Sequence, residues 1–116
     1  MDIKVKNGIA VIQSEDILIA DAQSALDLIA TVRYETGCDG VVLPKSAITE
    51  DFFVLSTGIA GEILQKFVNY RMRLAIIGDY AKYTSKPLRD YIYESNKAGH
   101  ICFTPDEAEA VRRLSE

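Results

Sequence analysis

The sequence predicts a single-domain α/β fold with a mixed, mostly parallel sheet of about five strands, an N-terminal β-hairpin and roughly four to five helices. Three observations predict it. The 116 residues, 48% of them hydrophobic, suffice for one domain with its own core. Short apolar segments alternate with longer amphipathic ones, as in βαβ units. No proline-rich, glycine-rich or repetitive stretch marks a linker, so residues 1–116 are expected to form one domain.

The first elements are a predicted hairpin and a helix. Apolar segments flank Asn7-Gly8, a dipeptide suited to the positive φ angles of a tight turn. Asp21 is a candidate N-cap for a helix that ends near Gly37. Helical spacing gives this helix an apolar stripe of Ala22, Ala25, Leu26, Ile29 and Ala30.

The middle of the chain predicts a buried strand and a second long helix. The run 40–43 is apolar without alternation and is closed by Pro44, as in a strand buried on both faces. Residues 49–51 are expected to open a short helical turn, and a longer helix is expected from near Ser56 to about Tyr70. Its apolar stripe consists of Ala60, Ile63, Leu64, Phe67 and Val68.

The last third predicts two more strands, each followed by a helix. Residues 74–77 form a second buried strand, and Ser85-Lys86-Pro87 opens a helix that ends at Gly99. A short strand over 101–103 follows. Residues 104–107 are predicted to be a capping box on Thr104, with proline at the first helical position of a terminal helix.

Composition and charge exclude several classes of protein. The net charge of −4 disfavours a dedicated nucleic-acid binder and a polybasic membrane anchor. No apolar run reaches the roughly 20 residues that cross a bilayer, and the first residues do not resemble a signal peptide. We therefore expect a cytoplasmic protein without a membrane partner. Cys38 and Cys102 are expected to be small buried hydrophobes, with a redox pair as the alternative.

Two loops are expected to meet at the carboxyl edge of the sheet, where α/β proteins bind ligands. They are residues 55–58 and 78–86, each leading into a helix. Hydroxyls, cations and a glycine at helix starts are suited to an anion or an acidic partner. The predicted ligand or partner surface comprises Ser56, Thr57, Gly58, Asp79, Tyr83, Ser85, Lys86 and Arg89. The alternative is that the hydroxyls are only helix caps.

Gly58 and Gly61 both fall at the start of the second long helix. Glycine there costs roughly 0.5–1 kcal/mol relative to alanine, which suggests close packing or a close partner.

Charge is unevenly distributed along the chain. Residues 66–97 hold seven cations against three acids, a net charge of +4, and five of the six tyrosines. Such a face suits an acidic partner, a nucleotide or single-stranded nucleic acid. The alternative is a solvated rim whose tyrosines half-cover the core.

Little in the sequence indicates catalysis. The lone His100 precedes the last strand, away from the carboxyl edge, and no cluster has metal-ligand spacing. We assign no catalytic residue, metal or cofactor. Asp79 is the only acid or base that a small enzyme at this edge would use.

Several long strings resemble a bacterial family, domain of unknown function 4180. They are Phe52-Phe53, residues 57–71 (TGIAGEILQKFVNYR), 74–79 (LAIIGD), 83–86 (YTSK) and 88–97 (LRDYIYESNK). The resemblance covers nearly the whole chain, and it implies no activity because none is established for that family.

A wider resemblance is to the STAS fold of anti-sigma-factor antagonists and of the cytoplasmic domains of sulfate transporters. The order of elements, the Ser-Thr-Gly helix start and a strand ending in Gly-Asp carry it. In the antagonists a partner kinase phosphorylates a serine at the corresponding helix start, and the matching positions here are Ser56 and Thr57. The antagonists have aspartate before that serine, where this chain has Leu55.

Two hypotheses about function follow. The first is a regulatory or protein-interaction module of STAS-like type that binds a protein partner or a small anionic ligand at the carboxyl edge. The second is a small-molecule or nucleotide-binding protein, or a small enzyme, that uses the same edge. Self-association into a homodimer is compatible with both.

Overall fold

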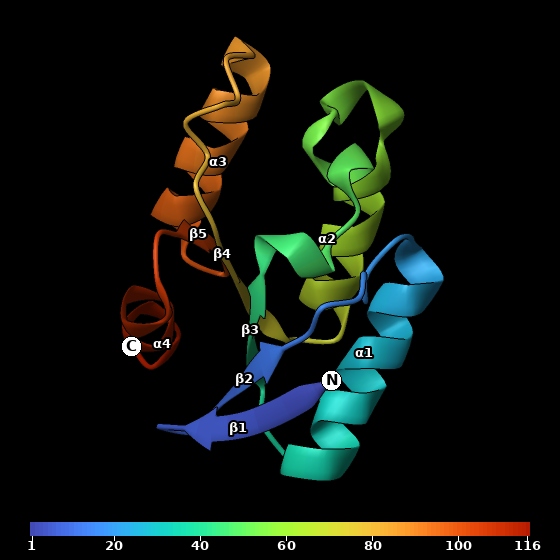
Figure 1. The fold of residues 1–116 in the computed structure, drawn as a ribbon, viewed down its shortest axis with the longest axis vertical. Coiled ribbons are helices and arrows are strands. Elements are labelled where there is room, and N and C mark those ends of the chain that lie inside the picture. Colours follow the sequence, from blue (N-terminus) through green and yellow to red (C-terminus); the bar gives the residue numbers. More distant parts are fainter.

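The computed structural model describes residues 1–116 and contains one sheet with the strand order β1-β2-β3-β4-β5 (Figure 1). β2 to β5 are parallel, and β1 is antiparallel to β2. The strands are β1 (Asp2–Lys6), β2 (Ile9–Gln13), β3 (Gly40–Pro44), β4 (Arg73–Ile77) and β5 (Ile101–Thr104). The predicted α/β class, with a mixed five-stranded sheet and an N-terminal hairpin, is confirmed.

Four α-helices and three short 3-10 helices join the strands. The α-helices are α1 (Ala22–Thr36), α2 (Ile59–Asn69), α3 (Lys86–Ala98) and α4 (Glu107–Leu114). The 3-10 helices η1 (Lys45–Ala47), η2 (Glu50–Phe53) and η3 (Leu55–Thr57) follow one another between β3 and α2. Because β2 to β5 step in one direction across the sheet, right-handed crossovers place α1, α2 and α3 on the same face.

Alternation along the strands divides the core into two parts. Val41 and Leu43 belong to the larger core under α1, α2 and α3, whereas Val42 belongs to a smaller core under α4. Cys102 lies in the smaller core and Cys38 in the larger one, and both are buried free thiols. The prediction that they are buried hydrophobes is confirmed.

Local signals placed several elements correctly. Asn7 and Gly8 have φ angles of 52° and 76°, as the tight turn requires. The Asp21 carboxylate accepts from Ser24 N at 2.8 Å and caps α1. Ser85 caps α3, and Gly99 ends that helix in the left-handed conformation.

The buried stripe of α1 was only partly predicted. Ala25 and Ile29 are buried as expected, together with Leu28 and Val32, whereas Ala30 is exposed. Rotating the helix toward Leu28 and Val32 removes more apolar surface from water than burying alanines.

The start of α2 differs from the prediction. Gly58 has a φ of 76°, which a right-handed helix does not continue through, so residues 55–57 form the separate turn η3 and α2 begins at Ile59. A Cβ at Gly61 would meet no atom within 4 Å, so the chain itself does not pack closely there. Val68, predicted in the apolar stripe, is 49% exposed.

The predicted capping box on Thr104 is wrong. Thr104 ends β5, where its carbonyl accepts from Gly78 N at 3.0 Å. Asp106 caps α4 instead, accepting from Glu109 N at 2.8 Å. The Thr104 carbonyl, which an N-cap residue uses for the first hydrogen bond of its helix, is thus bonded within the sheet instead. None of the helices is both long and apolar enough to cross a membrane.

Candidate functional site

The segments that follow β3 and β4 leave the sheet at the same edge, because these strands are parallel neighbours with Pro44 opposite Ile77. Lys45 follows β3 directly, and its ammonium lies over the rings of Phe53 and Tyr83, 4.7 Å and 4.9 Å from their centroids. Its Nζ also lies 3.0 Å from Glu50 Oε1. The Lys45 side chain is only 17% exposed, so these contacts hold it largely away from water.

Glu50 contacts Lys45 and also connects the segment after β3 with the segment after β4. The Tyr83 hydroxyl donates to Glu50 Oε2 at 2.5 Å, and the Tyr83 ring stacks on Phe53 with centroids 5.1 Å apart. The Tyr83 hydrogen bond, helped by Lys45, holds the pKa of Glu50 below its ordinary value. Burial, followed by the same hydrogen bond, raises the pKa of Tyr83 to about 12. We call Lys45, Glu50, Phe53, Tyr80 and Tyr83 the aromatic–lysine cluster.

Gly78 leaves the space in which Lys45 lies. A Cβ on Gly78 would stand 2.8 Å from Lys45 Cβ and 3.0 Å from its Cδ. These contacts are with the base of the lysine side chain and not with its free end. The position after β4 is therefore a glycine because the Lys45 side chain approaches its backbone closely. This contact packs the start of the β4–α3 loop against the cluster.

The loop between β4 and α3 is held by its own side chains. Asp79 Oδ1 accepts from Ala81 N at 2.9 Å, and the Tyr80 hydroxyl donates to Ile76 O at 2.7 Å. The Tyr80 ring meets Phe103 edge-on at 5.5 Å. Burial raises the pKa of Tyr80 above its usual range. The carboxylate of Asp79, the residue considered as an acid or base, thus accepts a backbone hydrogen bond that stabilises the turn.

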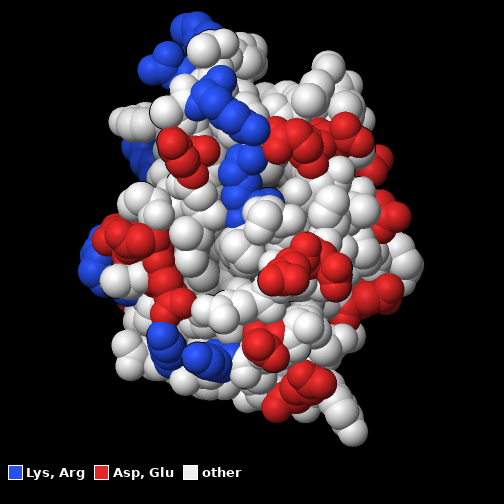
Figure 2. Space-filling view, viewed as in Figure 1, with Lys and Arg blue, Asp and Glu red and all other residues white.

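Three cations project from this loop and from the first turns of α3. Lys82 and Lys86 have side chains 63% and 84% exposed, and Arg89 is exposed without an ion pair. Lys86 pairs with Asp90 at 2.7 Å, an exposed contact of small energetic weight. Figure 2 shows Lys and Arg gathered over the upper left, where α3 begins, while separate patches of Asp and Glu lie on the right side.

The residues predicted in the other loop play local roles. Thr57 Oγ1 donates to the carbonyls of Asp51 and Val54 and accepts from Ile59 N at 3.2 Å, so its hydroxyl is occupied within the turn that precedes α2. Gly58 provides the left-handed conformation before α2. Ser56 is exposed, and its hydroxyl has no hydrogen-bond partner within the chain. No hydrogen bond or ion pair joins residues 56–58 to the β4–α3 loop.

Of the residues predicted for this surface, Tyr83 lies in the aromatic–lysine cluster and Lys86 and Arg89 are exposed at the start of α3, whereas Ser85 is the N-cap of that helix. The prediction did not name Lys45, Glu50, Phe53, Tyr80 and Lys82. The available signal was position: Lys45 stands directly after the predicted strand that Pro44 closes, as Gly78 stands after the next one. The prediction that the tyrosines half-cover the core holds for Tyr80, Tyr83 and Tyr91, whereas Tyr70 and Tyr93 are exposed.

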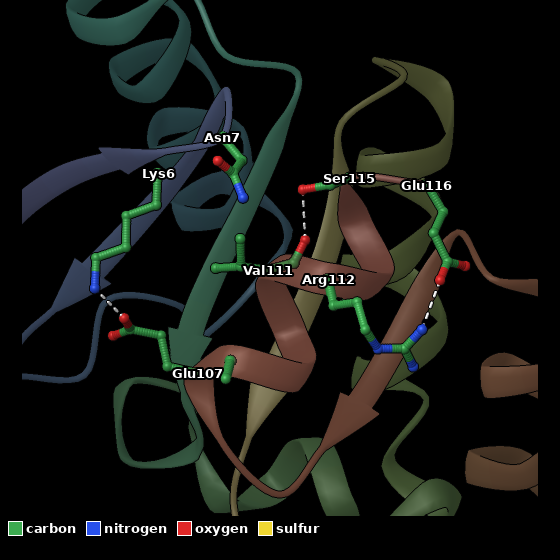
Figure 3. Close-up of a pocket in the computed structure, with 8 residues that line it drawn as sticks. Lys6, Asn7, Glu107, Val111, Arg112, Ser115 and Glu116 are labelled. Atoms are coloured by element: carbon green, nitrogen blue, oxygen red, sulfur yellow. Dashed lines mark hydrogen bonds and ion pairs between the residues drawn. The ribbon is translucent and has the colours of Figure 1, made fainter.

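The largest cavity lies away from this edge. It has a volume of about 760 Å³ and separates the hairpin turn from α4 (Figure 3). Its charged groups satisfy one another: Lys6 pairs with Glu107, and Arg112 pairs with Glu116 at 2.6 Å. A smaller groove of about 320 Å³ between α2 and α3 contains His100, whose Nε2 is buried without a partner.

A family model described as "Domain of unknown function (DUF4180)" matches residues 4–114. The chain belongs to the DUF4180 family. The match takes in every α-helix and all but the start of β1, and it confirms the family resemblance predicted from the sequence. No curated protein and no solved structure shows significant similarity to this DUF4180 chain. Its STAS-like character therefore stays a prediction.

Proposed function

We propose that this DUF4180 protein is a non-catalytic interaction module that binds an acidic protein surface through the β4–α3 loop and the first turns of α3. The binding residues are Lys82, Lys86 and Arg89, with Tyr83 and Lys45 behind them. The observation that carries the proposal is that the β4–α3 loop, held in place by its own hydrogen bonds, presents exposed cations to solvent. Asp79, Tyr80 and Tyr83 all bond within or beneath the loop, so little conformational entropy is lost when a partner binds.

A protein surface fits this site better than a small anion does. None of the three cations lines any of five cavities with volumes of about 260 to 760 Å³. The cavity at the carboxyl ends of β2, β3 and β4 has a volume of about 260 Å³, and its one charged residue is Glu107. Small-molecule sites usually reach roughly 300–1,000 Å³, and a carboxylate would repel an anion. An exposed cationic surface instead favours electrostatic steering of an acidic partner.

Partner capture with charge-matched variants tests the proposal. The Lys86→Ala/Arg89→Ala double variant removes two cations from the site, and Arg71→Asn/Lys97→Ala removes two exposed cations outside it. We expect the first variant to lose a partner that the wild type and the control retain, while all three melt at nearly the same temperature. Equal capture by both variants would contradict the proposal.

A thermal-shift screen separates this function from small-molecule binding. Nucleotides and phosphorylated metabolites are expected to leave the melting temperature unchanged. Specific stabilisation by one of them, lost in Lys86→Ala/Arg89→Ala, would replace the protein partner with a small anionic ligand at the same residues.

We further propose that regulation acts through Ser56, the exposed hydroxyl in the turn η3 that precedes α2. Thr57 is the weaker candidate because its hydroxyl is already hydrogen-bonded to backbone groups of the neighbouring turns. A phosphate would add about −1.5 to −2 charge at the same edge of the sheet as the cations of the β4–α3 loop. Intact mass of the protein from its own cells tests this, and the absence of any phosphorylated species would contradict it.

A further inference from the structure

The two edges of the sheet differ in how they are protected. At β5 the Asn96 side chain bonds both backbone groups of Phe103, accepting from its N–H at 2.6 Å and donating to its carbonyl at 3.2 Å. A strand arriving there would have to displace this amide. At β1 no side chain bonds the outer backbone, and β1 forms the margin of the sheet (Figure 1).

The hairpin determines which groups of β1 point outward. A two-residue turn joins Lys6 to Ile9, so this closing pair is hydrogen-bonded. Bonded pairs then alternate, and they return at Lys4 with Val11. The N–H and C=O of Ile3 and Val5 therefore face away from β2 and are free to pair with another strand.

The side chains of β1 alternate in chemistry as well. Ile3 packs against the larger core, and Val5 lies on the same face with 54% of its surface exposed. Lys6 points to the opposite face, where it meets Glu107 of α4 (Figure 3). Asp2 and Lys4 share that face, both are exposed, and neither has an ion-pair partner within the chain.

We propose that two copies of the chain pair through β1, antiparallel and centred on Ile3, so that one continuous sheet crosses both copies. This register sets Asp2 of each copy opposite Lys4 of the other on the charged face. On the apolar face it sets Ile3 against itself and Met1, 55% exposed, against Val5. Every cross-strand pair is then complementary, which is the arrangement that stabilises antiparallel strands.

The neighbouring registers lack this complementarity. Centring the pair on Lys4 sets that lysine against itself, and centring it on Val5 sets Lys4 against Lys6 twice. Lysines on an edge strand normally discourage pairing, and only the register centred on Ile3 gives Lys4 an acid to face.

Sedimentation of the untagged protein over a range of concentrations tests the proposal. We expect a monomer–dimer equilibrium that Asp2→Lys alone, or Lys4→Asp alone, weakens by about tenfold or more, since each creates two like-charge pairs per dimer. The double variant Asp2→Lys/Lys4→Asp is expected to restore dimerisation to within about threefold of the wild type. Val5→Pro, which removes an outward N–H and no β1–β2 bond, is expected to abolish it.

Each opposite result overturns the proposal. A wild type that stays monomeric at all concentrations excludes the interface. Single variants that dimerise like the wild type exclude the charge pairs. A double variant as weak as the single ones excludes the register centred on Ile3, because the register centred on Lys4 would then place the lysine introduced by Asp2→Lys opposite Lys6. Circular dichroism of each variant establishes that the fold is unchanged.

Discussion

Single residues at the carboxyl edge show which sequence features are structural. Gly78 and Gly61 are both glycines near the edge, yet only one has a neighbour that requires it. Gly78→Ala is expected to destabilise the protein by about 1–3 kcal/mol, because the new methyl group overlaps the base of the Lys45 side chain.

Gly61→Ala is the matched control for that substitution. Gly61 lies in the first turn of α2 with open space around it, so alanine is expected to stabilise the protein by about 0.5–1 kcal/mol. Urea unfolding of both variants measures the difference. Equal effects of the two substitutions would contradict the packing that we describe around Lys45.

Glu50 gives the cluster a dependence on pH. Its pKa is lowered in the folded protein, so its stabilising contribution is present above its unfolded pKa and is lost as pH falls through the lower folded value. The free-energy advantage of the wild type over Glu50→Gln is therefore expected to shrink as the pH falls below the ordinary glutamate pKa of 4.5. With the Glu50 side chain 59% exposed, the effect is expected to be about 0.5 kcal/mol or less. Urea titrations at several pH values measure it, and an advantage that grows with acid would contradict the assignment.

At the scale of elements, the aromatic–lysine cluster holds two irregular segments together. Tyr83 lies in the β4–α3 loop and Glu50 in η2, and their hydrogen bond joins them. Tyr83→Phe keeps the ring stack on Phe53 and removes only the hydroxyl. We expect faster amide exchange over residues 45–53 and 79–84, with α1 and α4 unchanged. Uniformly faster exchange would show that the bond supports the whole fold instead.

The elements also show what sequence alone determines. Caps such as Asp21 and Gly99 depend on a few adjacent residues, so their positions were predictable. The start of α2 depended on one φ angle at Gly58, and the start of α4 on competition with β5 for Thr104. Lys45 and Tyr83 are far apart in the chain. Their contact needed the parallel pairing of β3 with β4, which no local pattern contains.

At the scale of the whole molecule, a chain of net charge −4 concentrates cations in one stretch, residues 66–97. The fold places part of this stretch, Lys82 to Arg89, at the carboxyl edge of the sheet, and the free strand β1 lies at the sheet margin. Pairing through β1 would therefore leave the cationic residues available to a partner. The two proposed surfaces use no residue in common.

Site-specific photo-crosslinking in the native cell tests the central claim most directly. A p-benzoylphenylalanine at Thr84, which is exposed between Tyr83 and Ser85, samples the proposed surface, and the same group at Tyr34, 92% exposed on α1, is the control. The account predicts a discrete adduct of higher mass from position 84 and none from position 34. An adduct from position 34 alone would contradict it, since the partner would then bind α1 and not the cations of the β4–α3 loop.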